Sequence, residues 1–408
     1  MIKENVRYEP DDEDEEPFTQ YIYKTTVRNA KDRFDALGIT ISHFEELFNS
    51  KGWELIDYDA LLSHLHIDYD DYDEVGQKRY KKYVTYQKWI NSLKKIIKYE
   101  LENKNISYLK NENENKDLKL STECDKIIGY TLMDWDSETS YSYGLKLNDS
   151  EYPFLLRQIL EFCDDKSEIE LDFSNLQFWD YDCIPKAKVL NDYIEKTIVL
   201  LEGTSDKEIL EFSMSILYPH LKDLFYFMDF DSPLGAKRDG GTSYLIKNMK
   251  TFYFSKLKSK FIAVFDNDAE GFSSKMQLLN EVKDWPSNMK ALCYPILKQF
   301  ENYPTLSPSG KIDNIDINQK ACSIELYLPD FLIKEDGVFN PIVWESRKEI
   351  KIDGDKSFLY QGVINNKDKI KKNFVKFKNN IISGKETINK EDWSKMKLLL
   401  ESIVFCFR

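Results

Sequence analysis

The chain has 408 residues, of which 42% are hydrophobic and 14% aromatic, and its formal net charge is −14. This length is more than one compact core usually holds, and the apolar content suffices for two or three domains, so a wholly disordered chain is excluded. The acidic balance argues against a general nucleic-acid coat protein, which would be basic, although a local basic groove can coexist with it.

Cysteine usage and the first residues favour a cytoplasmic protein. The six cysteines are dispersed without a CxxC pair, which argues against a zinc cluster or a disulfide framework. No apolar leader follows Met1, and no window reaches the length of a membrane-spanning helix. We therefore expect a protein of the reducing cytoplasm that makes no use of a membrane.

The first 190 residues are predicted to form a mainly helical domain. An acidic run at residues 9–17 is bounded by prolines and is interpreted as a solvated loop. Strands are predicted at 18–23 and 169–173. The predicted helices are one at 25–37 that Gly38 ends, one opened by a capping box of Ser42 and Glu45, and three at 58–65, 80–101 and 152–162.

From residue 191 the pattern changes to strands that alternate with helices. The predicted strands cover 198–201, 225–230, 261–265 and 291–296, and the helices between them cover 205–217, a stretch from 242, and 272–282. This order is typical of a parallel sheet covered on both faces, whose functional crevice lies at the carboxyl ends of the strands. We predict this α/β domain over residues 191–335, with a last helix at 321–328.

Residues 336–408 are predicted to form a small helical region. One helix is basic, at 367–378, and one is amphipathic, from Trp393 to Val404. The apolar stripe of the second helix would suit self-association of the chain.

Carboxylates follow two of the predicted strands. Glu202 comes directly after the strand at 198–201, with Asp206 one helical turn further, and Asp266 and Asp268 follow the strand at 261–265. Mg²⁺ takes oxygen ligands such as these, together with waters and substrate phosphates. The acids therefore predict one metal site at the carboxyl edge of the sheet.

A simpler interpretation treats these acids as helix caps and first-turn charges. It would explain Asp206 or Asp268 taken singly. It does not explain Glu202, whose carboxylate follows four apolar residues. The set as a whole favours the metal site.

The acidic motifs resemble those of a known domain family. Glu202-Gly203-x-x-Asp206, followed by Asp266-x-Asp268-x-x-Gly271, resembles the topoisomerase–primase (Toprim) domain. Gly240-Gly241 and Ser323-x-Glu325 resemble the Toprim subgroup of OLD-type nucleases. Several further segments are similar to bacterial HEPN/Toprim-associated proteins: residues 23–27, 33–38, 217–221, 227–230 and 323–328.

This resemblance implies an α/β Toprim core that depends on Mg²⁺ or Mn²⁺, in a family frequent in phage-defence loci. It implies Glu202, Asp266 and Asp268 as catalytic residues. The metal ligands that it implies are Glu202, Asp206, Asp266, Asp268 and Glu325.

Several motifs of related activities are absent from the sequence. No histidine lies four to six residues after an arginine, so a HEPN-type ribonuclease finds no support. No tyrosine has the surroundings of a topoisomerase nucleophile, and no Walker-type phosphate loop is present. By analogy with other defence systems, a separate ATPase or another defence subunit is an expected partner.

A basic stretch beside the predicted sheet would hold a nucleic-acid backbone. It follows a second DxD, Asp229-Phe230-Asp231, for which an ordinary turn is the alternative. The residues predicted to contact phosphates are Lys237, Arg238, Lys247 and Lys250.

Three functional hypotheses follow. The first is a Mg²⁺-dependent nuclease that cleaves phosphodiester bonds of DNA or RNA, tRNA included, as the effector of an anti-phage defence system. The second is a non-catalytic scaffold of such a system that senses nucleic acid or a partner. The third is a toxic activity restrained by the acidic run at 9–17 or by another subunit. The sequence leaves open which nucleic acid is the substrate.

Overall fold

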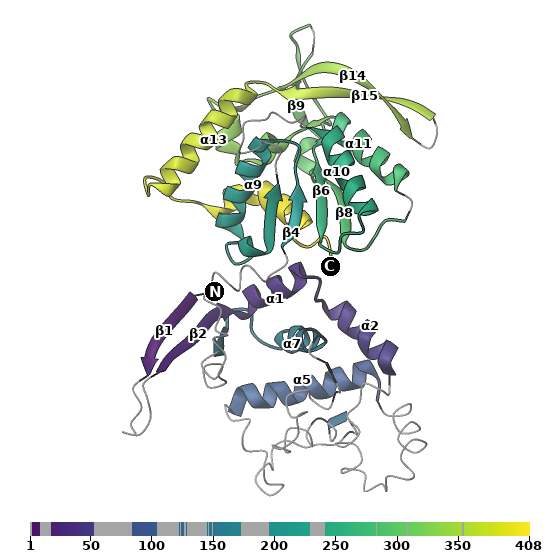
Figure 1. Cartoon of the computed structure of the whole chain (residues 1–408). Coiled ribbons are helices and arrows are strands. Elements are labelled where there is room, and N and C mark those ends of the chain that lie inside the picture. Colours follow the sequence, from purple (N-terminus) through teal and green to yellow (C-terminus); the bar gives the residue numbers. More distant parts are fainter. Residues whose placement is uncertain are drawn as a thin grey trace, which may run out of the picture. The chain divides into compact units, whose positions relative to one another are not determined.

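The computed structural model describes residues 2–8, 18–52, 84–103, 122, 124–125, 128, 145, 147–148, 150–172, 196–228, 241–282, 284–307, 309–352 and 355–408. They divide into two compact units, Met1–Tyr181 and Asp182–Phe407 (Figure 1). The predictions for the acidic run at 9–17, the helix at 58–65, the second DxD and the pair Lys237 and Arg238 lie outside the described residues.

The N-terminal unit combines helices with an antiparallel sheet. Its helices are α1 (Val27–Ala36), α2 (Ile41–Lys51), α5 (Tyr86–Asn103) and α7 (Tyr152–Leu160). Its strands are β1 (Ile2–Tyr8), β2 (Phe18–Thr26) and β3 (Glu168–Asp172), in the order β1-β2-β3. The two predicted strands are present and pair with each other across more than 140 intervening residues, and β1 joins them as a strand that was not predicted.

Tertiary packing explains the helices of this unit. The predicted apolar stripe of α5 is confirmed, since Trp89, Leu93 and Ile97 are buried against Phe44 and Phe48 of α2. The cap of α2 differs from the prediction. Thr40, two residues before Ser42, accepts the backbone N–H of His43, so α2 begins earlier than the capping-box motif indicated.

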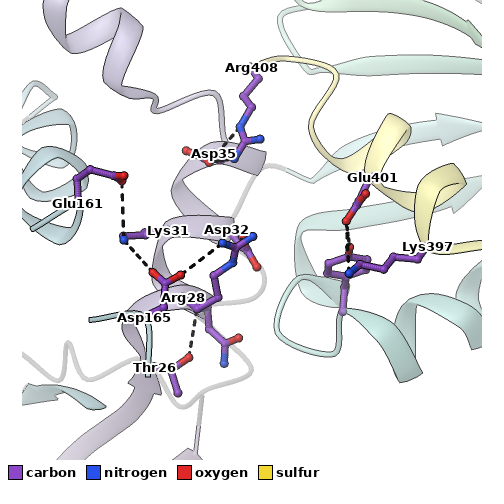
Figure 2. Close-up of polar contacts among 12 residues, drawn as sticks. Thr26, Arg28, Lys31, Asp32, Asp35, Glu161, Asp165, Lys397, Glu401 and Arg408 are labelled. Carbon is purple, nitrogen blue, oxygen red and sulfur yellow. Dashed lines mark hydrogen bonds and ion pairs between the residues drawn. The ribbon is translucent and has the colours of Figure 1, made fainter. Parts of the chain in front are cut away.

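Ion pairs surround α1 on its polar side. Lys31 lies 2.9 Å from Asp165 and 3.8 Å from Glu161 (Figure 2). Arg28 pairs with Asp32 one helical turn away. In each of these pairs one partner is largely buried, Lys31 or Asp32, and the other is exposed to solvent, so the pairs support the fold of the unit and do not by themselves indicate a site.

The second unit is built on a four-stranded parallel sheet. The strands are β4 (Thr197–Leu200), β5 (Phe225–Met228), β6 (Phe261–Phe265) and β8 (Met289–Cys293). The sheet order is β5-β4-β6-β8. All five residues of β6 are buried, as expected for a strand covered on both faces. The predicted strand and helix order is therefore confirmed for the described residues.

Helices cover both faces of this sheet (Figure 1). α10 (Thr242–Phe254) and α11 (Ala269–Glu281) bury Leu245, Met249 and Leu278 against one face. α9 (Thr204–Leu217) connects β4 to β5, and this step along the sheet runs opposite to the steps through α10 from β5 to β6 and through α11 from β6 to β8. Because such crossovers are right-handed, α9 lies on the other face, where α14 (Ser394–Val404) packs against it.

The order β5-β4-β6-β8 reverses direction between β4 and β6. The chain leaves β4 towards β5 and returns to β6 on the other side of β4. Ligands of open α/β sheets bind outside the carboxyl ends of the strands at this switch point. Glu202 follows β4 and Asp266 follows β6, so the sheet topology places both acids there.

The prediction of a helical region at 336–408 is partly wrong. Both predicted helices are present, as α13 (Lys367–Ile382) and α14. However, the long antiparallel strands β14 (Ile342–Ile352) and β15 (Asp355–Ile364) lie in this region. They join β9 (Tyr303–Leu306) and β10 (Ile312–Ile315) in a sheet of order β10-β9-β14-β15.

Short elements complete the unit. The helix predicted at 321–328 is wrong: β11 (Ala321–Cys322) is followed by the 3₁₀ turn η7 (Ile324–Tyr327). The other short elements are η5 (Lys222–Leu224), β7 (Asn267–Asp268), η6 (Lys298–Phe300), α12 (Asp330–Ile333), β12 (Lys334–Glu335), β13 (Val338–Phe339) and η8 (Lys390–Trp393). None of the helices in the described ranges combines the length and apolarity needed to cross a bilayer.

Candidate metal centre at the carboxyl edge of the parallel sheet

Glu202 and Asp266 meet at the switch point of the sheet. The backbone N–H of Asp266 donates a hydrogen bond of 2.9 Å to Oε1 of Glu202. The backbone N–H of Gly241, just before α10, donates to the carbonyl oxygen of Glu202 at 3.1 Å. These two bonds hold Glu202 between the ends of β4 and β6 and the start of α10, and the two acids that the sequence paired are thus neighbours.

The two aspartates of the DxD motif lie on a short, tightly folded segment. Asn267, between them, is buried and turned away from the sheet edge, where its Oδ1 accepts the backbone N–H of Gln319 at 3.0 Å. β7 pairs with β11, and Asp268 lies opposite Ala321. This pairing brings the segment that carries Ser323 and Glu325 beside the DxD motif, although more than 50 residues separate them.

Gly271 allows α11 to start against this segment. A Cβ at Gly271 would lie 2.2 Å from the carbonyl oxygen of Asp266, which no side chain can do without moving the backbone. A Cβ at Gly203 would make only ordinary contacts, the nearest with Asp206 at 3.7 Å. The close turn predicted at Gly271 is therefore confirmed, whereas the chain itself does not require glycine at 203.

Replacing Gly271 by alanine should accordingly displace Asp266 and lower the free energy of unfolding by about 1–3 kcal/mol, as overpacking of a close contact does. Gly203→Ala is the matched control and should cost about 1 kcal/mol or less. Urea unfolding of both variants measures the difference, and equal losses would contradict this role of Gly271.

Asp268 and Asp206 both act as helix caps. Oδ1 of Asp268 accepts the backbone N–H of Gly271 at 2.7 Å, and its Oδ2 accepts from Nε2 of Gln361 at 2.7 Å. Oδ2 of Asp206 accepts the backbone N–H of Gly203 at 3.1 Å. The simpler interpretation of these two acids is thus confirmed as part of their role, because their oxygens satisfy helix N-termini.

Gln361 was missed by the sequence-based prediction. Its amide oxygen accepts the backbone N–H of Glu270 at 3.1 Å, while its amide nitrogen donates to Asp268. It is carried by β15, more than 90 residues along the chain, and no local motif marks it. Gln361 positions the first turn of α11 and one oxygen of Asp268.

Asp266 is the least satisfied acid of the cluster. Its Oδ1 is buried and has no hydrogen-bond partner among the described residues. Burial, followed by repulsion from Glu202, Asp206 and Asp268, raises the pKa of Asp266 well above its usual range. A buried polar atom without a partner is rare and costs free energy. Asp266 therefore leaves one buried oxygen unsatisfied in this structure.

The neighbouring acids are perturbed in the same direction. Burial, with further repulsion from Asp268 and Asp206, raises the pKa of Glu202 to about 8. Burial and repulsion from Glu325 raise the pKa of Asp206 to about 7. Strong shifts from burial and like charges in one crevice are characteristic of functional sites.

The acids do not form a finished metal shell. Within the described part of the chain, no three His, Cys, Asp or Glu side chains converge closely enough to hold a metal ion as they stand. The donors are nevertheless carboxylate oxygens, which Mg²⁺ prefers, and the orphaned Oδ1 of Asp266 is available to one. The residues fit a hard divalent cation chemically, and binding would require their side chains to turn towards it.

Glu325 is completely buried on η7 and is paired with cations. Ser323 donates to its Oε2 at 2.7 Å, and Lys367 lies 3.3 Å from the same oxygen. Lys371 lies 3.4 Å from Oε1. The sequence marked α13 only as basic, so the placement of these two lysines beside the acids was missed.

The lysines predicted to track nucleic acid lie on α10. Lys247 is exposed, and Lys250 forms an ion pair of 2.8 Å with Glu281, the last residue of α11. Since α11 begins beside Asp268 and its 13 residues span about 20 Å, Lys250 lies towards the opposite edge of the sheet. Contact of Lys247 and Lys250 with nucleic acid stays a prediction.

Fold and site together define an α/β protein with a carboxylate cluster at the switch point of its parallel sheet. Residues 1–178 match the family model described as HEPN/Toprim N-terminal domain 1. This match covers less than half of the chain and supports a relation of its N-terminal part to HEPN/Toprim-associated proteins. The searches of curated proteins and of solved structures gave no match.

Proposed function

We propose that this chain is a metal-dependent nuclease that hydrolyses phosphodiester bonds of DNA or RNA through a Toprim core. The observation that carries the proposal is the buried, unpartnered Oδ1 of Asp266 beside Glu202 at the switch point of the sheet. The acidic motifs that resemble a Toprim domain lie in this unit, and the family match of the N-terminal unit agrees with them.

In this proposal Asp266, Asp268 and Glu202 hold Mg²⁺ or Mn²⁺, with Asp206 and Glu325 as further candidates. The ion would supply positive charge for a phosphate oxygen and a more acidic bound water. Both oxygens of Asp268 already accept hydrogen bonds, one from Gly271 and one from Gln361. Asp268 would have to give up one of these bonds to contact the ion.

Glu202 is proposed to move the proton. The N–H of Asp266 fixes Oε1 and so orients the carboxyl group. In the metal-free site burial raises the pKa of Glu202 to about 8. Next to a bound cation this pKa would fall towards neutral pH, where a general base or acid is most effective. Glu202 can therefore accept a proton from an attacking water and return it to the leaving oxygen.

The setting of this activity follows from the family resemblance. We propose a cytoplasmic effector of an anti-phage defence system, with nucleic acid as substrate and a separate ATPase or another defence subunit as partner. Lys237, Arg238, Lys247 and Lys250 remain the candidates for phosphate contacts. The apolar stripe of α14, which was expected to suit self-association, is instead buried within the chain at Met396, Leu399 and Ile403, so α14 is not proposed as a self-association surface.

Cleavage of three substrates tests the activity. Purified protein is incubated with plasmid, single-stranded DNA and total tRNA, each with Mg²⁺, with Mn²⁺ or with a chelator. We expect cleavage of at least one substrate that requires the metal and falls at least about 100-fold in Glu202→Gln, the loss expected when a general base is removed. Glu301→Gln, a change of an exposed acid in the same unit, should leave the rate unchanged. Equal cleavage by folded Glu202→Gln would contradict the assignment.

One observation favours a second candidate, a non-catalytic scaffold that senses nucleic acid or a partner. It is the lack of a converged group of metal ligands among the described residues. In a scaffold the acids would serve only as caps and charges at the sheet edge. Calorimetric titration with Mg²⁺ separates the two candidates, because the scaffold predicts no binding.

A further inference from the structure

Glu325 and Asp206 form a second pair of buried acids next to Asp266. Glu325 has no exposed surface, and Asp206 is 7% exposed. Repulsion from Glu325 is the largest electrostatic influence of another acid on Asp206. Two neighbouring buried carboxylates need a counter-charge, since an unpaired buried charge costs several kcal/mol.

Lys367 and Lys371 supply that charge. They lie one helical turn apart on α13, and each contacts a different oxygen of Glu325, at 3.3 and 3.4 Å. Both also attract Asp206. Two ammonium groups carry the same total charge as one divalent cation.

The lysines are held in place by the helix that carries them. Ile370, between the two lysines, and Phe374, after Lys371, are buried and anchor α13. Asn366, directly before the helix, donates through its side chain to Glu335 and Asn340. The anchored helix therefore places both ammonium groups within ion-pair distance of Glu325.

Glu325 keeps one unused oxygen position. Its Oε1 is buried, and although Lys371 lies within ion-pair distance, no hydrogen bond to it is present among the described residues. An oxygen in this condition could bind a metal ion if the lysines were absent.

We propose that Lys367 and Lys371 take the place of a second metal ion, so that the site of this chain binds one divalent cation at Asp266 and not two. The inference rests on the proposed function and sharpens it, since it assigns Glu325 to the lysines and not to the metal. It also makes the two lysines the residues that set the number of metal ions.

The number of Mn²⁺ ions bound per chain, measured by equilibrium dialysis and calorimetry, tests the proposal. We expect one ion in the wild type and two in the double variant Lys367→Met with Lys371→Met. The double variant should also melt at a lower temperature in chelator and recover when Mn²⁺ is added, because only the metal then neutralises Glu325.

Three control variants make the result specific. Lys367→Arg with Lys371→Arg keeps both charges and should still bind one ion. Lys372→Met with Lys376→Met removes two exposed charges from the same helix and should also bind one. Glu325→Gln should bind one ion as tightly as the wild type. If the double lysine variant does not fold, this variant still tests whether Glu325 is a ligand of the metal ion.

The outcomes separate this inference from the proposed function. One ion in the wild type and one in the folded double lysine variant would overturn the inference and leave the nuclease proposal intact. Two ions in the wild type, or loss of the ion in Glu325→Gln, would also overturn it. No bound ion in any of the proteins would overturn both.

Discussion

Replacing Asp266 by asparagine should abolish divalent-cation binding and, at the same time, stabilise the metal-free protein. Asp266 is repelled by Glu202, Asp206 and Asp268, and its Oδ1 is unpartnered among the described residues. Asparagine keeps the shape and removes the charge. We expect the free energy of unfolding in chelator at pH 8 to rise by about 1–3 kcal/mol, because the repulsion from the three neighbouring acids is removed.

Urea unfolding in chelator and calorimetry with Mg²⁺ measure the two effects on the same variant. Asp316→Asn is a control for the loss of one negative charge in the same unit, since the side chain of Asp316 makes local contacts with Asn318 and Lys320. It should retain metal binding. A metal-free Asp266→Asn protein that is less stable than the wild type would mean that Asp266 is satisfied in solution and that the cluster is not strained.

The metal-free protein should also lose stability as the pH rises from 5.5 to 8.5. Burial raises the pKa of Glu202 from 4.5 to about 8 and that of Asp206 from 3.8 to about 7. Between about pH 4 and 8 the folded state therefore binds more protons than the unfolded state, and the free energy of unfolding falls as the pH increases. We expect a loss of about 5 kcal/mol over this window, since one pKa unit corresponds to about 1.4 kcal/mol.

Two comparisons identify the groups responsible for this pH dependence. Glu202→Gln removes a carboxyl group whose pKa is raised to about 8. The unfolding free energy of this variant should therefore depend less on pH than that of the wild type. Saturating Mg²⁺ should have the same effect on the wild type, because the metal replaces the protons. Stability that rises with pH in chelator would show that these carboxylates are not perturbed.

The parallel sheet could be predicted because its signals are local. A few consecutive residues suffice to predict the apolar strand β6 and the helix α11 that follows it. The order of strands and helices then places the acids at the carboxyl ends of the strands. The switch point explains why Glu202 and Asp266 meet, which the sequence indicated only by their similar surroundings.

The parts that prediction missed depend on contacts between distant residues. Gln361 reaches Asp268 only because β15 lies beside α11. In the sequence Lys367 and Lys371 are two of several lysines of a basic helix. Their role is visible only in the structure, where they contact Glu325 of η7. The hairpin of β14 and β15 was missed because its many lysines and glutamates hide the alternation expected of a strand.

Calorimetric titration of Mg²⁺ and Mn²⁺ into the wild-type protein and into Asp266→Asn tests the central claim, that the cluster at the switch point is a divalent-cation site. We expect saturable binding with release of protons in the wild type, increasing in affinity from pH 6 to 8, because protons occupy the carboxylates of the metal-free site. Asp266→Asn should show no saturable binding. The absence of binding to the wild type, or equal binding to Asp266→Asn, would contradict the claim.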